Sequence, residues 1–365
     1  MEKIRVLVVD DSAVIRKIIA KGLRSEPQIE VVGYAENGKK ALEAFEIYAP
    51  DAITLDVEMP EMDGIAALKE IRKRDQHIPI VMFSSLTHEG GEEAIRALTA
   101  GASDCVGKPD YSTGSIEGAF KVIETELIPK ILSLAMQSSS RKKITQQDAT
   151  QNLTPVLEVF DSRLRLKDTV KQTGFAQALC IGSSTGGPMA LMELFGQIKQ
   201  PLKIPVFIVQ HMPESFTSLL AARLTTAGGM LIKEGSDNEV AISGVAYIAP
   251  GGFHMTLSRK GNQILIHLNK DAPENNCRPA VDVLFRSAAK VYGENLLAVV
   301  LTGMGSDGLK GSREIAASGG VIYAQDEKSS VVWGMPGAVA SAGLASKVTG
   351  IPEIAELIMS SAKAF

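Results

Sequence analysis

Two groups of polar residues directly follow short apolar segments, where strands of an α/β sheet would end. In the first group, Asp10 and Asp11 follow one apolar segment and Asp56 ends another. Converging carboxylates repel one another unless a cation neutralises them, and their oxygens are ligands that Mg²⁺ prefers. A carboxylate beside such a metal can attack a phosphoryl donor and become an acyl phosphate. Ser84 and Lys108, which end two later apolar segments, can then contact the transferred group.

A simpler explanation of this first group is that Asp10 and Asp11 end a strand and cap the helix that starts at Ala13. It leaves unexplained why Asp56, Ser84 and Lys108 stand at the ends of other strands. We therefore favour a phosphorylation site.

The second group begins in the stretch ALCIGSSTGGPMA, residues 178–190, where an apolar segment runs into Gly, Ser and Thr. The five residues ending at Gly186 fit the pattern G-x-S-x-G, which places a serine, here Ser184, on a tight strand-to-helix turn. A serine nucleophile needs a base, usually histidine, and His211 directly follows the next apolar segment. Asp307 follows a later one and can fix and stabilise the imidazolium.

Backbone N–H groups near Thr185 and Met304 can hold the oxyanion of such a reaction. The chain order Ser, His, Asp differs from the order Ser, Asp, His of the α/β-hydrolases, so that fold is not implied. The pattern predicts acyl transfer through Ser184, with His211 moving the proton.

Other assignments compete with this triad. Gly303, Gly305 and Gly308 fit the G-x-G-x-x-G fingerprint, and Asp326 stands near the place of a ribose-binding acid, so a dinucleotide fold is a rival. That rival leaves the serine and histidine unused. A catalytically inactive scaffold regulated by phosphorylation is a second rival.

The remaining acids, histidines and cysteines receive mainly structural interpretations. His254 stays possible as a catalytic contributor, whereas His267 lies inside a strand pattern. Asp282 is predicted to be a surface or first-turn charge of a helix. The three cysteines, which include Cys105 and Cys277, are far apart and lack a metal-ligand spacing, so they are expected to be small buried or half-buried thiols.

The elements that must position these residues form two series. Apolar β-branched segments alternate with helical patterns over the first 130 or so residues, which predicts a five-stranded parallel sheet covered on both faces. Residues 137–172 are polar and are predicted to be a linker. A second alternation from residue 173 predicts a doubly wound α/β domain over 173–365. Within it, residues 245–268 are expected to be an antiparallel insert with a hairpin around RKGNQ.

Composition narrows the class of protein. The chain has 365 residues and a formal net charge of −4, which gives no basic footprint for nucleic acid. No apolar run approaches the ~20 residues of a membrane-spanning helix, and the N-terminus does not have the pattern of a signal peptide. These features predict a cytoplasmic protein without a transmembrane segment.

The motifs VVDDS, TLDVEMPEMDG, MFSS and GKP together resemble the receiver domain of two-component response regulators, over residues 1–136. The resemblance implies a flavodoxin-like fold with Asp56 as phosphoacceptor and with Asp10, Asp11, Asp56 and the backbone carbonyl of Glu58 around Mg²⁺. It also implies that Ser84 is the switch hydroxyl and Lys108 the lysine that supports phosphorylation. Cys105 departs from the family, which usually carries an aromatic ring three residues before that lysine.

Residues 173–365 resemble the chemotaxis protein-glutamate methylesterases, on the motifs IGSSTGGP, QHMP, YIAPGGFHM, CRPAVDVLF, LTGMGSDGLKG and WGMPGAV. The resemblance implies a phosphorylation-activated hydrolase that removes methyl groups from glutamyl esters of chemoreceptors and also deamidates glutamines. It implies Ser184, His211 and Asp307 as the triad, oxyanion contacts at Thr185 and Met304, and no cofactor for ester hydrolysis. The implied partners are methyl-accepting chemoreceptors as substrate and a chemotaxis histidine kinase as phosphodonor.

Overall fold

The computed structural model describes residues 3–85, 88–108, 116–148 and 176–362. The described residues up to 148 form one compact unit and those from 176 form another, and each unit is treated by itself. Helix α6 (Ile128–Asp148) extends into the segment predicted as a linker, and residues 149–172 of that segment lie outside the described residues. No helix in these ranges is both long enough and apolar enough to cross a membrane.

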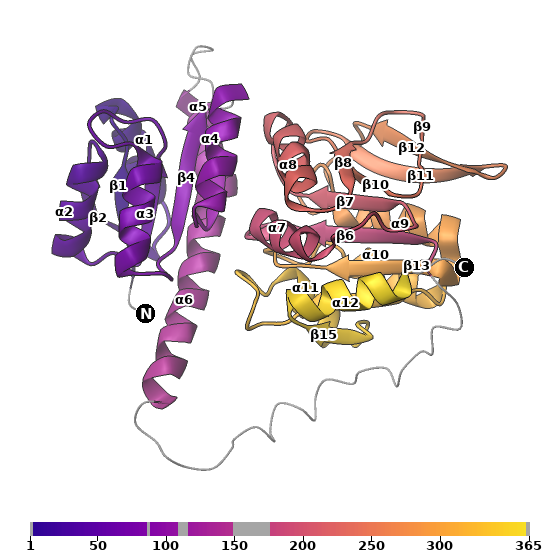
Figure 1. Ribbon diagram of the computed structural model, residues 1–365. Helices are drawn as coiled ribbons and strands as arrows, with labels where there is room; N and C mark the ends of the chain where they lie inside the picture. The colour runs from indigo at the N-terminus through magenta and orange to yellow at the C-terminus, as the bar shows by residue number, and fades with distance from the viewer. Residues whose placement is uncertain (1–2, 86–87, 109–115, 149–175, 363–365) are drawn as a thin grey trace. The chain divides into compact units, whose positions relative to one another are not determined.

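The first unit is built on a five-stranded sheet in the order β2-β1-β3-β4-β5, with every neighbouring pair parallel (Figure 1). The central strands are largely apolar and mostly buried, as expected of a parallel sheet with helices on both faces. The strands are β1 (Ile4–Val9), β2 (Ile29–Ala35), β3 (Ala52–Asp56), β4 (Ile80–Ser85) and β5 (Asp104–Lys108).

Polar side chains start the first three helices of this unit. Ser12, Asn37 and Asp63 each accept a hydrogen bond from a backbone N–H in the first turn of the helix that follows, which satisfies a donor with no partner inside the helix. The helices are α1 (Ala13–Leu23), α2 (Gly38–Tyr48), α3 (Gly64–Arg74), α4 (His88–Thr99), α5 (Ile116–Val122) and α6, with a π-helical turn, η2 (Ile123–Leu127), between the last two.

The second unit contains a seven-stranded parallel sheet in the order β15-β14-β13-β6-β7-β10-β8. The chain runs outward from β6 to β7 on one side and returns to β13 on the other, so the order reverses between β6 and β13. In open α/β sheets, such a reversal opens a crevice at the carboxyl ends of the strands. The strands are β6 (Ala178–Ser183), β7 (Val206–Gln210), β8 (Leu231–Glu234), β10 (Val245–Ile248), β13 (Leu296–Val300), β14 (Val321–Gln325) and β15 (Lys347–Thr349).

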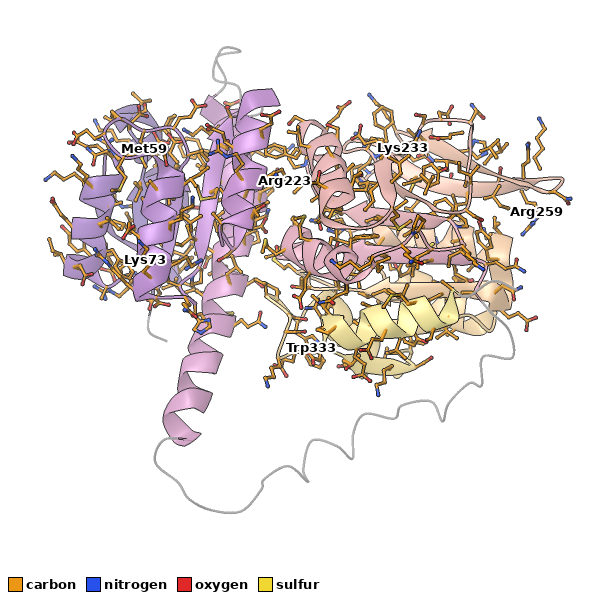
Figure 2. All side chains as sticks on the ribbon, in the orientation of Figure 1. Met59, Lys73, Arg223, Lys233, Arg259 and Trp333 are labelled. Carbon is orange, nitrogen blue, oxygen red and sulfur yellow. The ribbon has the colours of Figure 1, made fainter. Side chains whose placement is uncertain are left out.

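The predicted hairpin around RKGNQ is present, but the antiparallel insert that contains it was predicted to begin too early. Strands β11 (His254–Lys260) and β12 (Gln263–Asn269) pair antiparallel around Gly261, and the short β9 (Glu239–Val240) pairs with β12. Figure 2 shows Arg259 near the outer end of this hairpin. The segment 245–248, expected in the antiparallel insert, instead forms β10 inside the parallel sheet. A four-residue apolar strand fits either environment, so the pattern alone did not separate them.

Helix α9 (Val281–Tyr292) lies between the parallel sheet and the hairpin, and it packs on both. Phe285 and most other apolar side chains of α9 are therefore buried, and its N-terminus is held at the sheet edge where the site lies. The other helices are α7 (Gly187–Gln197), α8 (Glu214–Ala227), α10 (Leu309–Ala317), α11 (Met335–Ser341) and α12 (Ile351–Ser361), with a short 3-10 turn, η4 (Gly293–Asn295).

Candidate active site

Ser184 lies in a tight turn between β6 and α7, as the G-x-S-x-G pattern predicts. The N–H of Gly187 donates to the carbonyl of Ser184 at 2.7 Å, and the Ser184 N–H donates to the carbonyl of Thr302 at 3.0 Å. Gly186 has a φ of 75°, which glycine adopts without strain, and a Cβ there would lie 2.4 Å from Val331. The turn therefore requires glycine and leaves Ser184 half-buried at the sheet edge.

Gln210, the last residue of β7, braces this turn from the neighbouring strand. Its Oε1 accepts a hydrogen bond from the Ser183 hydroxyl at 2.7 Å, and its Nε2 donates to the carbonyl of Ser184 at 2.9 Å. The Nε2 also donates to the carbonyl of His211 at 3.1 Å. One buried amide thus fixes the serine turn relative to the histidine, a role that the sequence analysis missed.

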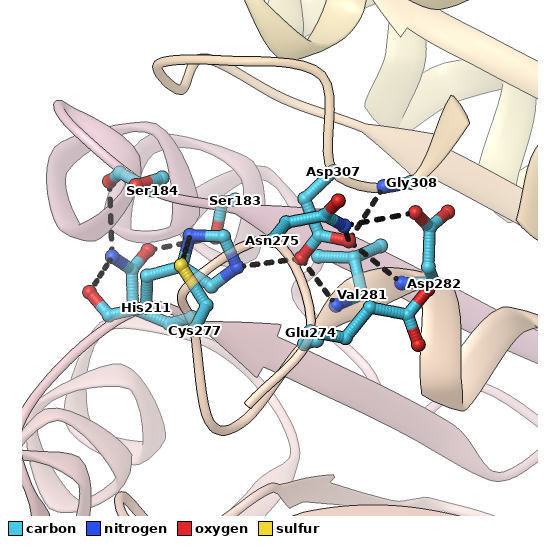
Figure 3. A network of polar contacts seen from close by, with 12 residues as sticks. Ser183, Ser184, His211, Glu274, Asn275, Cys277, Val281, Asp282, Asp307 and Gly308 are labelled. Carbon is cyan, nitrogen blue, oxygen red and sulfur yellow. Dashed lines mark hydrogen bonds and ion pairs between the residues drawn. The ribbon is translucent and has the colours of Figure 1, made fainter. Parts of the chain in front are cut away.

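His211 and Asp307 are brought together from the ends of β7 and β13 (Figure 3). His211 Nε2 lies 2.8 Å from Asp307 Oδ2, and both side chains are largely buried. The Ser184 hydroxyl makes no hydrogen bond to His211 within the described residues; such bonds often tighten only when substrate binds. The Nδ1 atom of His211 faces Cys277, whose Sγ lies 3.4 Å away.

The carboxylate of Asp307 is held at the N-terminus of α9. The N–H of Val281 donates to Oδ2 at 2.6 Å, and those of Asp282 and Gly308 donate to Oδ1 at 3.0 and 2.9 Å. The Nδ2 of Asn275 also donates to Oδ1, at 2.8 Å. A helix N-terminus favours an anion, so this environment keeps Asp307 charged.

Burial acts against the charged form of both groups, and their contacts overcome it. Burial raises the pKa of Asp307, but the hydrogen bond and charge of His211, with the N–H groups of Asp282 and Val281, bring the pKa below its ordinary value. For His211, burial lowers the pKa, but the hydrogen bond to Asp307 and the contact with Cys277 raise it above its ordinary value. The pair therefore favours an imidazolium beside a carboxylate.

The segment that carries Met304 passes close to the serine turn. A Cβ placed on Gly303 would lie 2.9 Å from Ser184 Cβ, so the two backbones approach as closely as glycine permits. Thr185, predicted as the other oxyanion contact, is buried, and its carbonyl accepts a hydrogen bond from the Thr302 hydroxyl at 2.9 Å. Both predicted oxyanion residues thus lie in the turns that border Ser184.

Three assignments from the sequence are settled by contacts. Asp282 lies in the first turn of α9, which is one of its two predicted places, but it is buried and not a surface charge; its carboxylate accepts a hydrogen bond from the N–H of Gly311 at 2.6 Å. His254 is also buried, and its Nδ1 accepts from the N–H of Ala280 at 3.2 Å, which makes it a structural residue. His267 contacts the Ser258 hydroxyl at 2.7 Å inside the hairpin, as a strand residue should.

Asn275 and Cys277 are further residues that the sequence analysis did not place at the site. They lie in the irregular segment between β12 and α9, whose path no periodic pattern predicts. The only signal was the pair Asn275-Asn276 in PENNCRP, since asparagine is favoured where a turn needs positive φ. Gly305 and Gly308, two glycines of the rival dinucleotide fingerprint, take positive φ in the loop that carries Asp307.

The first unit carries the other predicted site, at the carboxyl ends of β1, β3 and β5. Carboxylate oxygens of Asp10, Asp11 and Asp56 all lie within 4.8 Å of one another. Lys108 Nζ lies 2.7 Å from Asp56 Oδ2 and 3.0 Å from Asp10 Oδ2. A cavity of about 430 Å³ opens onto this cluster, and it is lined by Asp11, Asp56, Glu58, Ser84 and Lys108 among others. The Ser84 hydroxyl donates to the carbonyl of Gly90 at 2.9 Å.

The carboxylates of this cluster are under-neutralised. Burial is the largest influence on Asp56; the charge of Lys108 opposes it and that of Asp10 adds to it, so the pKa rises to about 6. Burial also raises the pKa of Asp10, although Lys108 opposes the rise. One lysine cannot compensate three carboxylates, so the donor set fits a divalent cation with oxygen ligands.

Cys105, the departure from the receiver pattern, is buried on β5. Its carbonyl accepts a hydrogen bond from Lys130 Nζ at 2.8 Å, and the same ammonium lies 3.1 Å from Asp104 Oδ1. The thiol itself is buried, and this burial raises its pKa to about 12. The thiol therefore stays protonated. Lys130 connects α6 to β5 through its contacts with Cys105 and Asp104.

Two family models match the chain and agree with the two sites. Residues 6–114 match the response regulator receiver domain, and residues 179–358 match the CheB methylesterase. The chain thus belongs to a class in which a receiver precedes a hydrolase domain. Known relatives define the family more narrowly.

The chain is 44% identical, over 98% of its length and 99% of the relative's, to a protein-glutamate methylesterase/protein-glutamine glutaminase of Trichodesmium erythraeum. It is 46% identical to the protein of that name from a Nocardioides species, over 98% of this chain and 95% of the relative. The CheB methylesterase catalytic domain of Thermotoga maritima is 39% identical, with a TM-score of 0.50 over 51% of this chain and 98% of that domain. The chain belongs to the CheB methylesterase family, which confirms the resemblance and both predicted α/β folds.

Proposed function

We propose that this protein is a phosphorylation-activated hydrolase that demethylates glutamyl methyl esters of methyl-accepting chemoreceptors and deamidates their glutamines, for chemotaxis adaptation. The observation that carries the proposal is the Ser184 turn beside the 2.8 Å His211–Asp307 pair, in a chain 44% identical to a methylesterase/glutaminase over nearly its full length. We assign its action to the cytoplasm, where the signalling helices of such receptors lie.

In the proposed mechanism, Ser184 Oγ attacks the carbonyl carbon of the ester or amide. The proton of Ser184 goes to His211, at Nδ1, because Nε2 is held by Asp307. The oxyanion is stabilised by backbone N–H groups of the turns at Thr185 and Met304. His211 returns the proton to the leaving group, which departs as methanol or ammonia and leaves an acyl-Ser184.

Water then hydrolyses this acyl intermediate by the reverse roles. His211 accepts a proton from the water, and Ser184 leaves with that proton restored. Asp307 keeps its charge throughout and stabilises the imidazolium that forms twice in each cycle. Esters are intrinsically easier to cleave than amides, so demethylation should be the faster activity.

Control is assigned to the first unit. Asp56 Oδ attacks the phosphorus of the phosphohistidine of a chemotaxis histidine kinase; the P–N bond breaks, the kinase histidine leaves, and Asp56 becomes an acyl phosphate. The groups that would hold Mg²⁺ are Asp10, Asp11, Asp56 and the backbone carbonyl of Glu58; the ion, when bound, neutralises charge on the phosphoryl group. Lys108 and the Ser84 hydroxyl then contact the new phosphate, and phosphorylation relieves an inhibition of the hydrolase unit.

The test is methanol release from methylated receptor membranes by wild type and Ser184→Ala, each with and without acetyl phosphate. Release by the wild type alone, raised by the phosphodonor, is the expected result. Absence of release from the wild type would favour a phosphorylation-controlled binding scaffold. Labelling by a serine-directed organophosphonate separates the two further, because a scaffold would form no Ser184 adduct.

A further inference from the structure

One four-residue turn, Glu274–Cys277, contacts both members of the His211–Asp307 pair. Its ends bridge to each other, since the N–H of Glu274 donates to the carbonyl of Cys277 at 3.1 Å and the reverse bond is 2.9 Å. The two residues between them, Asn275 and Asn276, have φ values of 53° and 60°. Apart from glycine, asparagine is among the residues that tolerate this left-handed region best, so the sequence suits the turn.

The turn is also fixed at its outer side. The guanidinium of Arg286, on α9, donates to both carboxylate oxygens of Glu274 at 2.8 and 2.6 Å. Bidentate pairs of this kind fix orientation as well as distance. The turn is thus attached to the same helix whose N-terminus holds Asp307.

The two side chains that this turn directs inward reach different members of the pair (Figure 3). Asn275 Nδ2 donates to Asp307 Oδ1 at 2.8 Å and to Asp282 Oδ2 at 3.0 Å, so one amide bridges two buried carboxylates. Cys277 Sγ lies 3.4 Å from His211 Nδ1, the nitrogen that Asp307 does not contact. The ring of His211 is therefore held at both nitrogens, by Asp307 on one side and by Cys277 on the other.

We propose that the turn Glu274–Cys277 is a positioning element of the active site, in which Asn275 fixes the rotation of the Asp307 carboxylate and Cys277 fixes the His211 ring. The inference rests on the proposed function, because it concerns how the same base and acid are held. A ring bonded only at Nε2 can swing about that bond, and misplacement of a base by a fraction of an ångström slows proton transfer. Substrate binding lets Ser184 take over Nδ1 from Cys277, since this ring nitrogen makes one hydrogen bond at a time.

The experiment pairs each variant with a matched control in the full chain. Asn275→Gly removes the bridging amide, and Asn276→Gly is its control: glycine suits the positive φ of both positions, and no described hydrogen bond uses the Asn276 side chain. Cys277→Ala removes the contact with His211, whereas Cys277→Ser keeps a side chain there that can hydrogen-bond to Nδ1. Far-UV circular dichroism checks that all four variants fold.

We expect kcat for methanol release to fall about tenfold in Asn275→Gly and Cys277→Ala, with KM unchanged, as loss of one hydrogen bond to the reacting groups would cause. Asn276→Gly and Cys277→Ser should stay within about threefold of the wild type. The inference would be overturned if the wild type releases methanol and Asn275→Gly and Cys277→Ala are as fast as their controls. The proposed function would then remain intact.

A second readout does not depend on turnover. Burial lowers the pKa of His211, whereas the contacts with Asp307 and Cys277 raise it. NMR titration of the His211 ring in the free protein, assigned with His211→Gln, should therefore show a lower pKa in Cys277→Ala and an unchanged one in Asn276→Gly. An unchanged His211 pKa in Cys277→Ala would contradict the proposed positioning contact, whether or not the wild type releases methanol. Absence of methanol release from the wild type would refute the proposed function instead.

Discussion

Both units place a buried aspartate beside a basic side chain at the carboxyl edge of a parallel sheet, yet the pKa values of the two carboxylates are shifted in opposite directions. Asp307 lies 2.8 Å from His211, and Asp56 lies 2.7 Å from Lys108. The pKa of Asp307 falls below its ordinary value, whereas that of Asp56 rises to about 6. Burial works in the same direction at both sites, so the difference lies in the other partners.

Hydrogen-bond donors and neighbouring charges explain this difference. Asp307 receives three backbone N–H groups and the amide of Asn275, besides His211. Asp56 receives one backbone N–H, from Val57 at 2.7 Å, and has the carboxylate of Asp10 close by. A carboxylate that accepts hydrogen bonds on both oxygens is a fixed anion that can orient a base. A carboxylate whose charge is incompletely neutralised can bind a cation and react with a phosphoryl group. The comparison predicts that the two sites respond oppositely to loss of charge.

The largest effect should come from the nucleophile. Ser184→Ala should lower methanol release by at least about 10³-fold, because no other group in the proposed mechanism forms the acyl intermediate. Ser183→Ala is the matched control: it removes only the 2.7 Å bond to Gln210 and should cost about tenfold or less. If Ser184→Ala kept a tenth or so of the wild-type rate, the assignment of the nucleophile would be wrong.

Removal of the charge of Asp307 should be the next largest effect. Asp307→Asn should lower kcat by about 10²–10⁴-fold, because an amide cannot stabilise the imidazolium. Asp282→Asn is the control, since Asp282 is a buried carboxylate of the same helix N-terminus that has no hydrogen bond to His211 among the described contacts. Similar losses in the two variants would mean that Asp307 acts only through the fold.

The pH dependence of the hydrolase should carry the same signature. Because the pKa of His211 is raised, the neutral base forms only at higher pH, and kcat/KM should rise through a limb above the ordinary histidine value of about 6.5. Asp307→Asn should move that limb to lower pH, as measured from pH–rate profiles with saturating phosphodonor. A wild-type limb at or below the ordinary value would contradict the ion-pair interpretation.

Whether a site residue could be predicted from the sequence depends on its position relative to the strands. Ser184, His211 and Asp10 directly follow apolar strand patterns, Asp56 ends one, and Asp307 follows one through a short glycine turn. Parallel strands bring their carboxyl ends to one edge. Asn275 and Cys277 were missed because they lie in an irregular segment whose path depends on tertiary contacts. Asp282 was misjudged because a first-turn acid is usually exposed, and here the neighbouring helix covers it.

Asp56 should respond differently from Asp307, since its charge serves control and not hydrolysis. Asp56→Asn should leave basal methanol release unchanged but abolish the rise caused by acetyl phosphate, because an amide cannot form the acyl phosphate. Asp63→Asn is a conservative control in the same loop: Asp63 caps α3 through the N–H of Ala66, and asparagine caps equally well. Activation that survives in Asp56→Asn would indicate another acceptor.

The smallest expected effect is that of Asp56→Asn on stability. Most substitutions lower the free energy of unfolding, whereas this one should raise it. The pKa of Asp56 is about 6 in the folded state and near 3.8 in the unfolded state. Its favourable contribution to the free energy of unfolding is therefore fully present below pH 3.8 and is lost as the pH rises through about 6. At neutral pH without Mg²⁺, Asp56→Asn should therefore raise the free energy of unfolding of the first unit, by up to about 3 kcal/mol. Loss of the contact with Lys108 would reduce this gain.

Amide hydrogen exchange of β1 and β3 in the full chain measures this change. Fluorescence of Trp333, the single tryptophan of the sequence, reports on the second unit and should not change. Added Mg²⁺ should stabilise the wild type more than Asp56→Asn, because the cation compensates the same buried charge that the substitution removes. A variant that is less stable than the wild type at pH 7 would mean that Lys108 already neutralises Asp56, and the contrast between the two carboxylates would then disappear.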